Sequence, residues 1–372
     1  MDSSCNRCGA PAALVSRGEH FCSACFVRFV SGKARRRLEG LKVAYARDGP
    51  APAPRPVVLA LGLTAASITL LDLLTESLAE QRRVHRGRVG FDLTAVHVDV
   101  AADAAGSTAA RAAFDRLAAA NADVRFVWRD PADFLASPAE FAAAADGSAG
   151  FGADAPPATL AAILAAVDRS ARPDLVAIVV ERLVAATAAG ATVIWADTMT
   201  RLAERTLALT AKGRGAAIPA ALAEGAALQP LREVLRSEAE AYVRLRALDG
   251  VCERPARPAV VRMMSVDDVM RGYIADVEPA FPSVVSTVVR TADKLQDSGP
   301  GAAVCVLCGA ASDGAPQRWL ERITVQAAPA PADPPADPAP LCYGCVVATR
   351  GRAFPWPRPS GAAVAAQFEI SE

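Results

Sequence analysis

Along the chain, segments whose hydrophobic positions are typical of a strand are followed by segments whose hydrophobic positions recur at helical spacing. Residues 57–61 form a continuous apolar run, and after a turn at residues 62–65 the apolar positions recur at helical spacing up to residue 74. Residues 91–100 (FDLTAVHVDV) alternate with a period of two, which is typical of a strand. This region therefore predicts a strand, a helix and a second strand in succession.

The same alternation continues along the chain. We predict two more strands, at residues 124–128 and 191–196. The predicted helices are residues 107–121, 159–170, 174–189, 199–211, the second part of 229–248, 265–276 with Ser265 as N-cap, and 281–295. Strands that alternate with helices favour an α/β fold with a doubly wound parallel sheet.

Composition divides the chain into three units. Residues 51–56 (APAPRP) form a stiff linker, and residues 327–340 form a Pro/Ala-rich surface excursion. We predict an N-terminal unit at 1–50, a core domain at 51–300 and a C-terminal unit at 301–372. A chain of 372 residues is long enough for a full α/β core with one or two small modules.

Charge and hydropathy limit the possible binding partners of the chain and the cellular compartment in which we expect it. The formal net charge is +0, so any attraction to nucleic acid must be local. No run of about 20 apolar residues occurs and the N-terminus is polar, which predicts neither a membrane span nor a signal peptide. We therefore expect a reducing, cytoplasmic environment, in which paired cysteines bind metal and do not form disulfides.

Eight of the nine cysteines form CxxC pairs. They are Cys5, Cys8, Cys22 and Cys25 in the N-terminal unit and Cys305, Cys308, Cys342 and Cys345 in the C-terminal unit. Each pair places two thiolates on one tight turn, and two such turns complete a tetrahedral site of the kind that binds zinc. The alternative is a set of redox motifs or unpaired thiols. We expect two structural zinc ions, and a structural role for Cys252.

A run of basic residues follows the first cysteine group and is interleaved with Phe26, Phe29 and Tyr45. Such a run is commonly a solvated helix face. Its place beside a metal-stiffened turn favours instead a contact with an RNA backbone. The candidate RNA-binding residues are Arg28, Lys33, Arg35, Arg36, Arg37 and Lys42.

The turn after the first strand lies where open α/β folds commonly bind phosphate. It contains one glycine, Gly62, and no charged residue. Leu63 and Ala66 carry Cβ atoms where a phosphate cradle needs bare backbone. The sequence therefore predicts the frame of a phosphate site without its chemistry.

Together these motifs resemble the cytoplasmic tRNA 2-thiolation protein 2 family. The resemblance rests on the CxxC pairs with their basic helix and on three further segments. These are 197–215 (DTMTRLAERTLALTAKGRG), 230–242 (PLREVLRSEAEAY) and 281–295 (FPSVVSTVVRTADKL). It implies the fold of the PP-loop ATP pyrophosphatases, which is also described as adenine nucleotide alpha-hydrolase-like.

Catalytic relatives in that wider family use the motif SGGxDS to hold ATP. The corresponding window is Gly62, Leu63, Thr64, Ala65, Ala66 and Ser67. Only Ser67 matches, because Leu63 and Thr64 replace the two glycines and Ala66 replaces the aspartate, a Mg²⁺ contact. Catalytic relatives also carry cysteines in the core that can hold an iron–sulfur cluster, where this chain has Cys252 alone. The resemblance thus implies a non-catalytic subunit, a pseudo-enzyme that binds neither ATP nor an iron–sulfur cluster.

The implied role is wobble-uridine thiolation, the formation of 5-methoxycarbonylmethyl-2-thiouridine in the tRNAs for Lys, Glu and Gln. The implied partners are tRNA, a catalytic PP-loop subunit in a heterodimer, and a thiocarboxylated ubiquitin-like sulfur carrier. Two alternatives stay open. The chain is either an active ATP-dependent tRNA thiolase in its own right, or a zinc-stapled interaction protein without a role on RNA.

Overall fold

The computed structural model describes most of the core and both cysteine groups. The described residues are 4–45, 52–101, 103–135, 160–166, 169–222, 227–252, 264–295, 303–305, 308, 310–312 and 342–348. The Pro/Ala-rich stretch predicted at 327–340 lies outside them.

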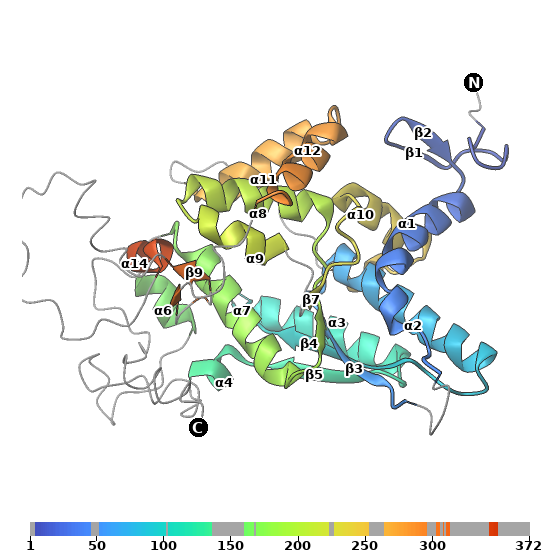
Figure 1. Cartoon of the computed structure of the whole chain (residues 1–372), viewed down its shortest axis with the longest axis horizontal. Helices are drawn as coiled ribbons and strands as arrows, with labels where there is room; N and C mark the ends of the chain where they lie inside the picture. The colour runs from blue at the N-terminus through green and yellow to red at the C-terminus, as the bar shows by residue number, and fades with distance from the viewer. Residues whose placement is uncertain are drawn as a thin grey trace, which may run out of the picture.

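A five-stranded parallel sheet forms the centre of the molecule (Figure 1). Its strands are β3 (Arg55–Ala60), β4 (Phe91–Val98), β5 (Arg125–Arg129), β6 (Thr192–Ile194) and β7 (Ala227–Leu228). Their order is β5-β4-β3-β6-β7, and all neighbours run parallel. The chain thus starts in the middle of the sheet and extends it first to one side and then to the other. The predicted doubly wound sheet is confirmed.

Helices cover both faces of this sheet. On one face lie α2 (Ala65–Val84), α3 (Ala104–Ala120) and α10 (Arg236–Leu245), and on the other lies α7 (Arg172–Ala188). Val57 and Leu59 of β3 belong to the first apolar cluster, whereas Val58 and Ala60 belong to the second. Because both faces are covered, every position of this strand end is apolar and no alternation is visible in the sequence.

A third apolar cluster joins α8 (Met199–Ala211), α9 (Ile218–Leu222), α11 (Val266–Val277) and α12 (Pro282–Ala292). Ser265 caps α11 as predicted, since its Oγ accepts the backbone N–H of Asp268 at 3.1 Å. Val285 and Val289 of α12 are buried against α8 and α9. The segment 281–295 is therefore mainly a packing element.

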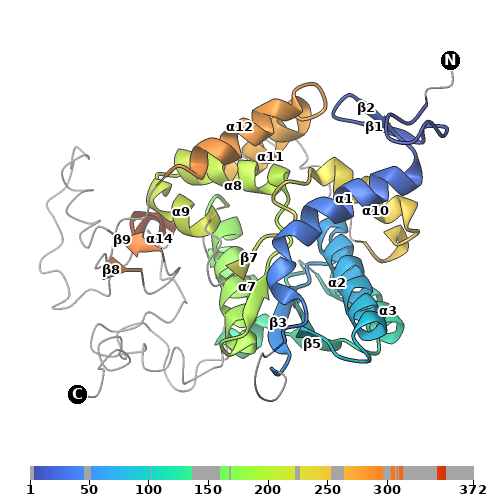
Figure 2. The same ribbon diagram turned by 45° about the vertical axis from the view of Figure 1, so that its right-hand side comes forward.

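The two cysteine-containing units lie at opposite ends of the molecule in both views (Figures 1 and 2). The N-terminal unit consists of β1 (Leu14–Ser16), β2 (Glu19–Phe21) and α1 (Ser23–Arg37), and the C-terminal unit contains β8 (Ala303–Val304), β9 (Ala311–Ser312) and α14 (Tyr343–Ala348). Short helices α4 (Pro131–Leu135) and α6 (Leu160–Ala166) complete the described core. In these parts of the chain, no helix is long and apolar enough to cross a membrane.

Candidate metal centres and the remodelled phosphate loop

The N-terminal cysteines converge as predicted. The sulfur atoms of Cys5, Cys8, Cys22 and Cys25 all lie within 4.8 Å of one another, and those of Cys8 and Cys22 are 3.6 Å apart. A tetrahedral ion with metal–sulfur bonds of about 2.3 Å holds its sulfurs roughly 3.8 Å apart. The four thiols therefore fit a single divalent ion.

The C-terminal cysteines form a second group with the same geometry. The sulfurs of Cys305, Cys308, Cys342 and Cys345 again lie within 4.8 Å of one another, and those of Cys308 and Cys342 are 3.6 Å apart. Residues 309–341 separate the two pairs in sequence. An insertion of this length costs little, because loop-closure entropy grows only with the logarithm of loop length.

The two groups are copies of one local structure. Each begins with CxxCGA, at residues 5–10 and 305–310. The Cys5 backbone N–H donates to Ala10 O at 2.7 Å, and that of Cys305 donates to Ala310 O at 2.8 Å. Ser4 bridges Pro11 in the first copy just as Val304 pairs with Ala311 in the second, and in both copies the later CxxC pair opens a helix. The repeated CxxCGA is the sequence signal for this duplication, which was not predicted from the sequence.

Crowding of the thiols explains why each group favours a cation. The backbone N–H of Cys22 lowers the pKa of the Cys5 thiol to about 6, whereas the side chain of Cys8 raises the pKa of Cys25 to about 12. In the C-terminal group, contact with Cys305 raises the pKa of Cys345. One thiolate thus forms easily and suppresses ionisation of its neighbours. A bound divalent ion removes that penalty, so metal binding and thiol ionisation are coupled.

The loop after β3 keeps the position of a phosphate site. It follows β3 and lies beside β6, at the point where the strand order reverses, which is where ligands bind in open α/β sheets. Its helix N-terminus is closed by its own side chains. The Thr64 N–H donates to Ser67 Oγ at 3.0 Å, and the Ser67 N–H donates to Thr64 Oγ1 at 3.4 Å. Ser67, the one residue that matches the catalytic motif, is buried in this internal cap.

Leu63 departs from the prediction in one respect. From the sequence we expected its side chain to fill the volume that phosphates need. The structure instead buries the side chain completely in the apolar core beneath the loop. Its backbone has a φ of 52°, a conformation that glycine adopts at little cost and leucine does not. The buried side chain therefore anchors the loop, and backbone strain accompanies the anchor.

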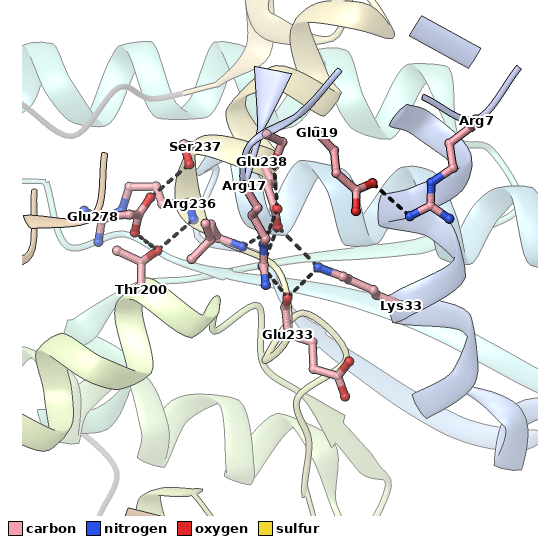
Figure 3. A network of polar contacts seen from close by, with 12 residues as sticks. Arg7, Arg17, Glu19, Lys33, Thr200, Glu233, Arg236, Ser237, Glu238 and Glu278 are labelled. Carbon is pink, nitrogen blue, oxygen red and sulfur yellow. Dashed lines mark hydrogen bonds and ion pairs between the residues drawn. The ribbon is translucent and has the colours of Figure 1, made fainter. Parts of the chain in front are cut away.

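A buried carboxylate ties the N-terminal unit to the core (Figure 3). Glu238 of α10 is 2% exposed, and its Oε1 accepts Arg17 Nε at 2.7 Å, from the turn between β1 and β2. Lys33 Nζ of α1 lies 3.7 Å from Glu238 Oε2, which also caps the backbone N–H of Leu235 at 2.9 Å. Three segments distant in sequence therefore meet at one side chain.

The candidate RNA-binding residues contact groups of this chain. Arg35 pairs with Glu76 at 2.9 Å, and Arg37 with Glu233 at 3.0 Å. Lys33 is half-buried by Glu238 and the ring of Phe29. Two open cations are Arg36, 71% exposed and 3.5 Å from Glu233, and Lys42, 70% exposed and 3.0 Å from Glu39. Arg28 is exposed and lies against the first cysteine group, with Nη2 3.6 Å from Cys25 Sγ.

A second polar network joins the segments 197–215 and 230–242. Arg236 places Nη2 2.7 Å from each carboxylate oxygen of buried Glu204. Buried Glu278 accepts the hydroxyls of Thr200 and, at 2.9 Å, Ser237 (Figure 3). These polar residues therefore hold α8, α10 and α11 together. Their hydrogen-bonding groups and charges pair with one another. This pairing explains why segments that pack inside the protein contain charged residues.

Cys252 lies apart from both cysteine groups. It is partly buried against the core, and its Sγ donates to Leu248 O at 3.5 Å. This placement fits the structural role expected for it.

The chain therefore combines a doubly wound parallel sheet, a closed loop at the switch point of that sheet and a four-cysteine group at each end. This sheet architecture is shared with a solved tRNA thiolase. The U34-tRNA thiolase NcsA from Methanococcus maripaludis, solved with its 4Fe–4S cluster, has this fold. The comparison gives a TM-score of 0.58 and 14% identity and covers 88% of this chain and 98% of NcsA.

The chain belongs to the cytoplasmic tRNA 2-thiolation protein 2 family. A relative of that name from Phaeosphaeria nodorum is 32% identical over 82% of this chain and 84% of its own length. Another, from Yarrowia lipolytica, is 29% identical over 94% of both chains. The family model described as "Cytoplasmic tRNA 2-thiolation protein 2" matches residues 265–347, from the cap of α11 into α14. The resemblance drawn from the motifs is confirmed.

Proposed function

We propose that this chain is the non-catalytic subunit of the cytoplasmic complex that 2-thiolates the wobble uridine of the tRNAs for Lys, Glu and Gln. It acts in a heterodimer with a catalytic PP-loop subunit, which activates the uridine with ATP. A thiocarboxylated ubiquitin-like protein delivers the sulfur. The name of the family supports a role in tRNA 2-thiolation. The assignment of a non-catalytic role to this chain rests on the loop after β3.

That loop is the observation that carries the proposal. A phosphate cradle needs backbone N–H groups that point outward and no side chain of its own to satisfy them. Here Thr64 and Ser67 cap the helix reciprocally, and Leu63 fixes the loop from below. Ala66 stands where the aspartate of SGGxDS would contact Mg²⁺. A chain with this loop does not hold ATP–Mg for adenylation.

We assign zinc to both four-cysteine groups. Sulfurs within 4.8 Å of one another suit one tetrahedral ion, whereas a cubane cluster holds its thiolates farther apart because four irons lie between them. A zinc ion with four thiolates has no open position for a substrate. Its contribution is to cross-link a small unit that has little core of its own.

The tRNA contact is assigned to the exposed cations of the N-terminal unit. Arg28, Arg36 and Lys42 are exposed, and the ion pairs of Arg36 and Lys42 are of the surface kind. Such pairs contribute about 0–1 kcal/mol, so a phosphate can replace the carboxylate with little loss. Lys33 and Arg37 are more deeply engaged and contribute mainly to the fold.

Reconstitution tests the proposal. The full chain, the catalytic subunit with an intact SGGxDS, tRNA, ATP and the thiocarboxylated carrier are combined, and 2-thiouridine is measured by mass spectrometry of digested tRNA. We expect thiolation only when both subunits are present, and none from this chain alone. Thiolation by this chain alone would establish an active thiolase. Undiminished thiolation without it, together with no binding of tRNA, would establish an interaction protein with no role on RNA.

A further inference from the structure

The two copies of the cysteine module differ in where a neighbouring positive charge comes from. In the N-terminal copy Arg28 lies three residues after Cys25, and its Nη2 is 3.6 Å from that sulfur. In the C-terminal copy the position three residues after Cys345 is Ala348, which is buried. The C-terminal module therefore carries no arginine at the equivalent site.

An arginine from the core occupies the corresponding space. Arg214 follows α8 in the turn before the short helix η3 (Gly215–Ala217), and its side chain is only 9% exposed. A Cβ added to Gly344, between Cys342 and Cys345, would overlap Nε and Cζ of Arg214. The equivalent N-terminal residue is Ala24, which is exposed. Glycine at this position leaves room for the guanidinium, which approaches the backbone closely.

The charges around Arg214 are consistent with this placement. Its Nη2 lies 3.3 Å from the carboxylate of Asp174 on α7, which also pairs with Lys212 at 2.7 Å. Lys212 in turn pairs with Asp267 at 2.6 Å, so Asp174 is shared between two cations and does not pair with Arg214 alone. The guanidinium is therefore held between the Asp174 carboxylate and the backbone of Gly344, which lies between Cys342 and Cys345.

We propose that Arg214 is the outer-sphere charge partner of the C-terminal metal site and fastens that module to α7 and α8. The inference rests on the proposed metal occupancy. Four thiolates and one divalent ion carry a net charge of −2, and Cys305 and Cys345 are fully buried. A buried anion needs a nearby cation, and Arg214 provides one through a planar group that also contacts Asp174. The N-terminal site, in which one cysteine is exposed, depends far less on its exposed Arg28.

Metal release from the full-length chain tests this role. The variants are Arg214→Ala, which removes the cation, and Gly344→Ala, whose new methyl group displaces it without changing any charge. The matched controls are Arg28→Ala and Ala24→Gly at the equivalent N-terminal positions. Zinc is counted by elemental analysis, and its release to a chromogenic chelator is followed over time.

We expect both C-terminal variants to release one of two zinc ions roughly 10- to 100-fold faster than the wild type, the range seen when outer-sphere partners are removed. The other ion should leave at the wild-type rate. The double variant should be no faster than Arg214→Ala alone, because both changes remove one interaction. The controls should change either rate by less than about 3-fold, within the scatter of exposed ion pairs.

Each other outcome is decisive. Wild-type release of both ions from Arg214→Ala and Gly344→Ala would overturn the role of Arg214 and leave the two-zinc assignment intact. Additive effects of the two changes would show that Gly344 acts by another route, and would overturn the packing on which the inference rests. Fewer than two zinc ions in the wild-type chain would overturn the metal assignment itself, and this inference with it.

Discussion

The two four-cysteine groups share one local structure but differ in how deeply their surroundings bury them. The N-terminal group exposes Cys8 and is attached through polar contacts, above all Arg17 and Lys33 around Glu238. The C-terminal group buries Cys305 and Cys345 completely, in the same apolar cluster as α7 and the strands beneath it. We therefore expect the same four-cysteine structure to contribute differently to stability at the two ends, depending on the surface against which it packs.

The N-terminal unit is nevertheless continuous with the core. Cys5 and Cys25 belong to the large apolar cluster that contains α2 and α10, and the rings of Phe21, Phe26 and Phe29 extend that cluster toward the cysteines. Gly90 approaches the backbone of Leu41 and Lys42 so closely that a Cβ would overlap it. The boundary predicted near residue 50 thus separates sequence compositions but does not separate apolar cores.

The largest expected effect is the loss of a C-terminal ligand. Cys345→Ser should remove one metal ion and open the apolar cluster around α7, because a structural zinc supplies on the order of 10 kcal/mol to such a site. We expect the melting temperature of the whole chain to fall by more than about 10 °C, measured by calorimetry.

The matched change at the exposed end is Cys8→Ser. It should also release one metal ion, but raise hydrogen exchange only in β1, β2 and the start of α1, while the sheet stays protected. If both substitutions lower the melting temperature equally, the contrast between the two groups is wrong.

The attachment of the N-terminal unit should depend on the charge of Glu238. Glu238→Gln removes the carboxylate that Arg17 and Lys33 share, and should destabilise this unit by about 2–3 kcal/mol, below the full value for a buried pair because Arg17 is 31% exposed. Exchange in α1 should rise accordingly. Glu240→Gln, an exposed position on the same helix, is the control and should change nothing measurable.

Lys33, which lies beside Glu238, should make the free energy of unfolding depend on pH. We expect this effect to be smaller than that of Glu238→Gln. Burial lowers the pKa of Lys33 to about 8, so between pH 8 and 10 the unfolded chain binds more protons at this residue than the folded chain. The free energy of unfolding should therefore rise with pH across this window in the wild type, relative to Lys33→Met. Urea denaturation at pH 7.5 and 9.5 measures the difference, and a constant gap between the two proteins would contradict the assignment.

The smallest expected effect concerns tRNA. Arg36→Glu together with Lys42→Glu should weaken tRNA binding and reduce the salt dependence by roughly 0.7–0.9 per lost phosphate contact. Arg111→Glu is the control, because Arg111 is an exposed arginine on α3 that is likewise paired with a surface carboxylate, Asp115. Equal effects of the two changes would mean that the N-terminal cations are only a solvated face.

Much of the local structure could be predicted from the sequence. The continuous apolar run of β3, the helix at Met199–Ala211 and the grouping of eight cysteines follow from period and spacing, and the structure has all three. Strand β7 could not be predicted, because an edge strand of two residues is too short to show an alternation of apolar and polar positions. Nor could the sequence reveal that Arg17 meets Glu238, since a contact 221 residues apart in sequence depends on the completed fold.

The loop after β3 shows a further limit. The residues Leu63, Thr64 and Ala66, which replace those of the catalytic motif, indicated a lost phosphate site. The direction of the Leu63 side chain, however, depends on its positive φ, which the sequence pattern does not predict. Likewise, the reciprocal cap of Thr64 and Ser67 could be read as a motif only once the helix was known to begin at Ala65.

Calorimetric titration of the full chain with ATP–Mg shows whether the loop after β3 still binds nucleotide. The catalytic PP-loop subunit, titrated under the same conditions, serves as the positive control. We predict no heat of binding for this chain at micromolar to low millimolar nucleotide, because Thr64 and Ser67 close the helix N-terminus and Ala66 offers no carboxylate. Magnesium-dependent binding with micromolar affinity, abolished by a bulky residue at Gly62, would contradict the account of this chain as a non-catalytic subunit.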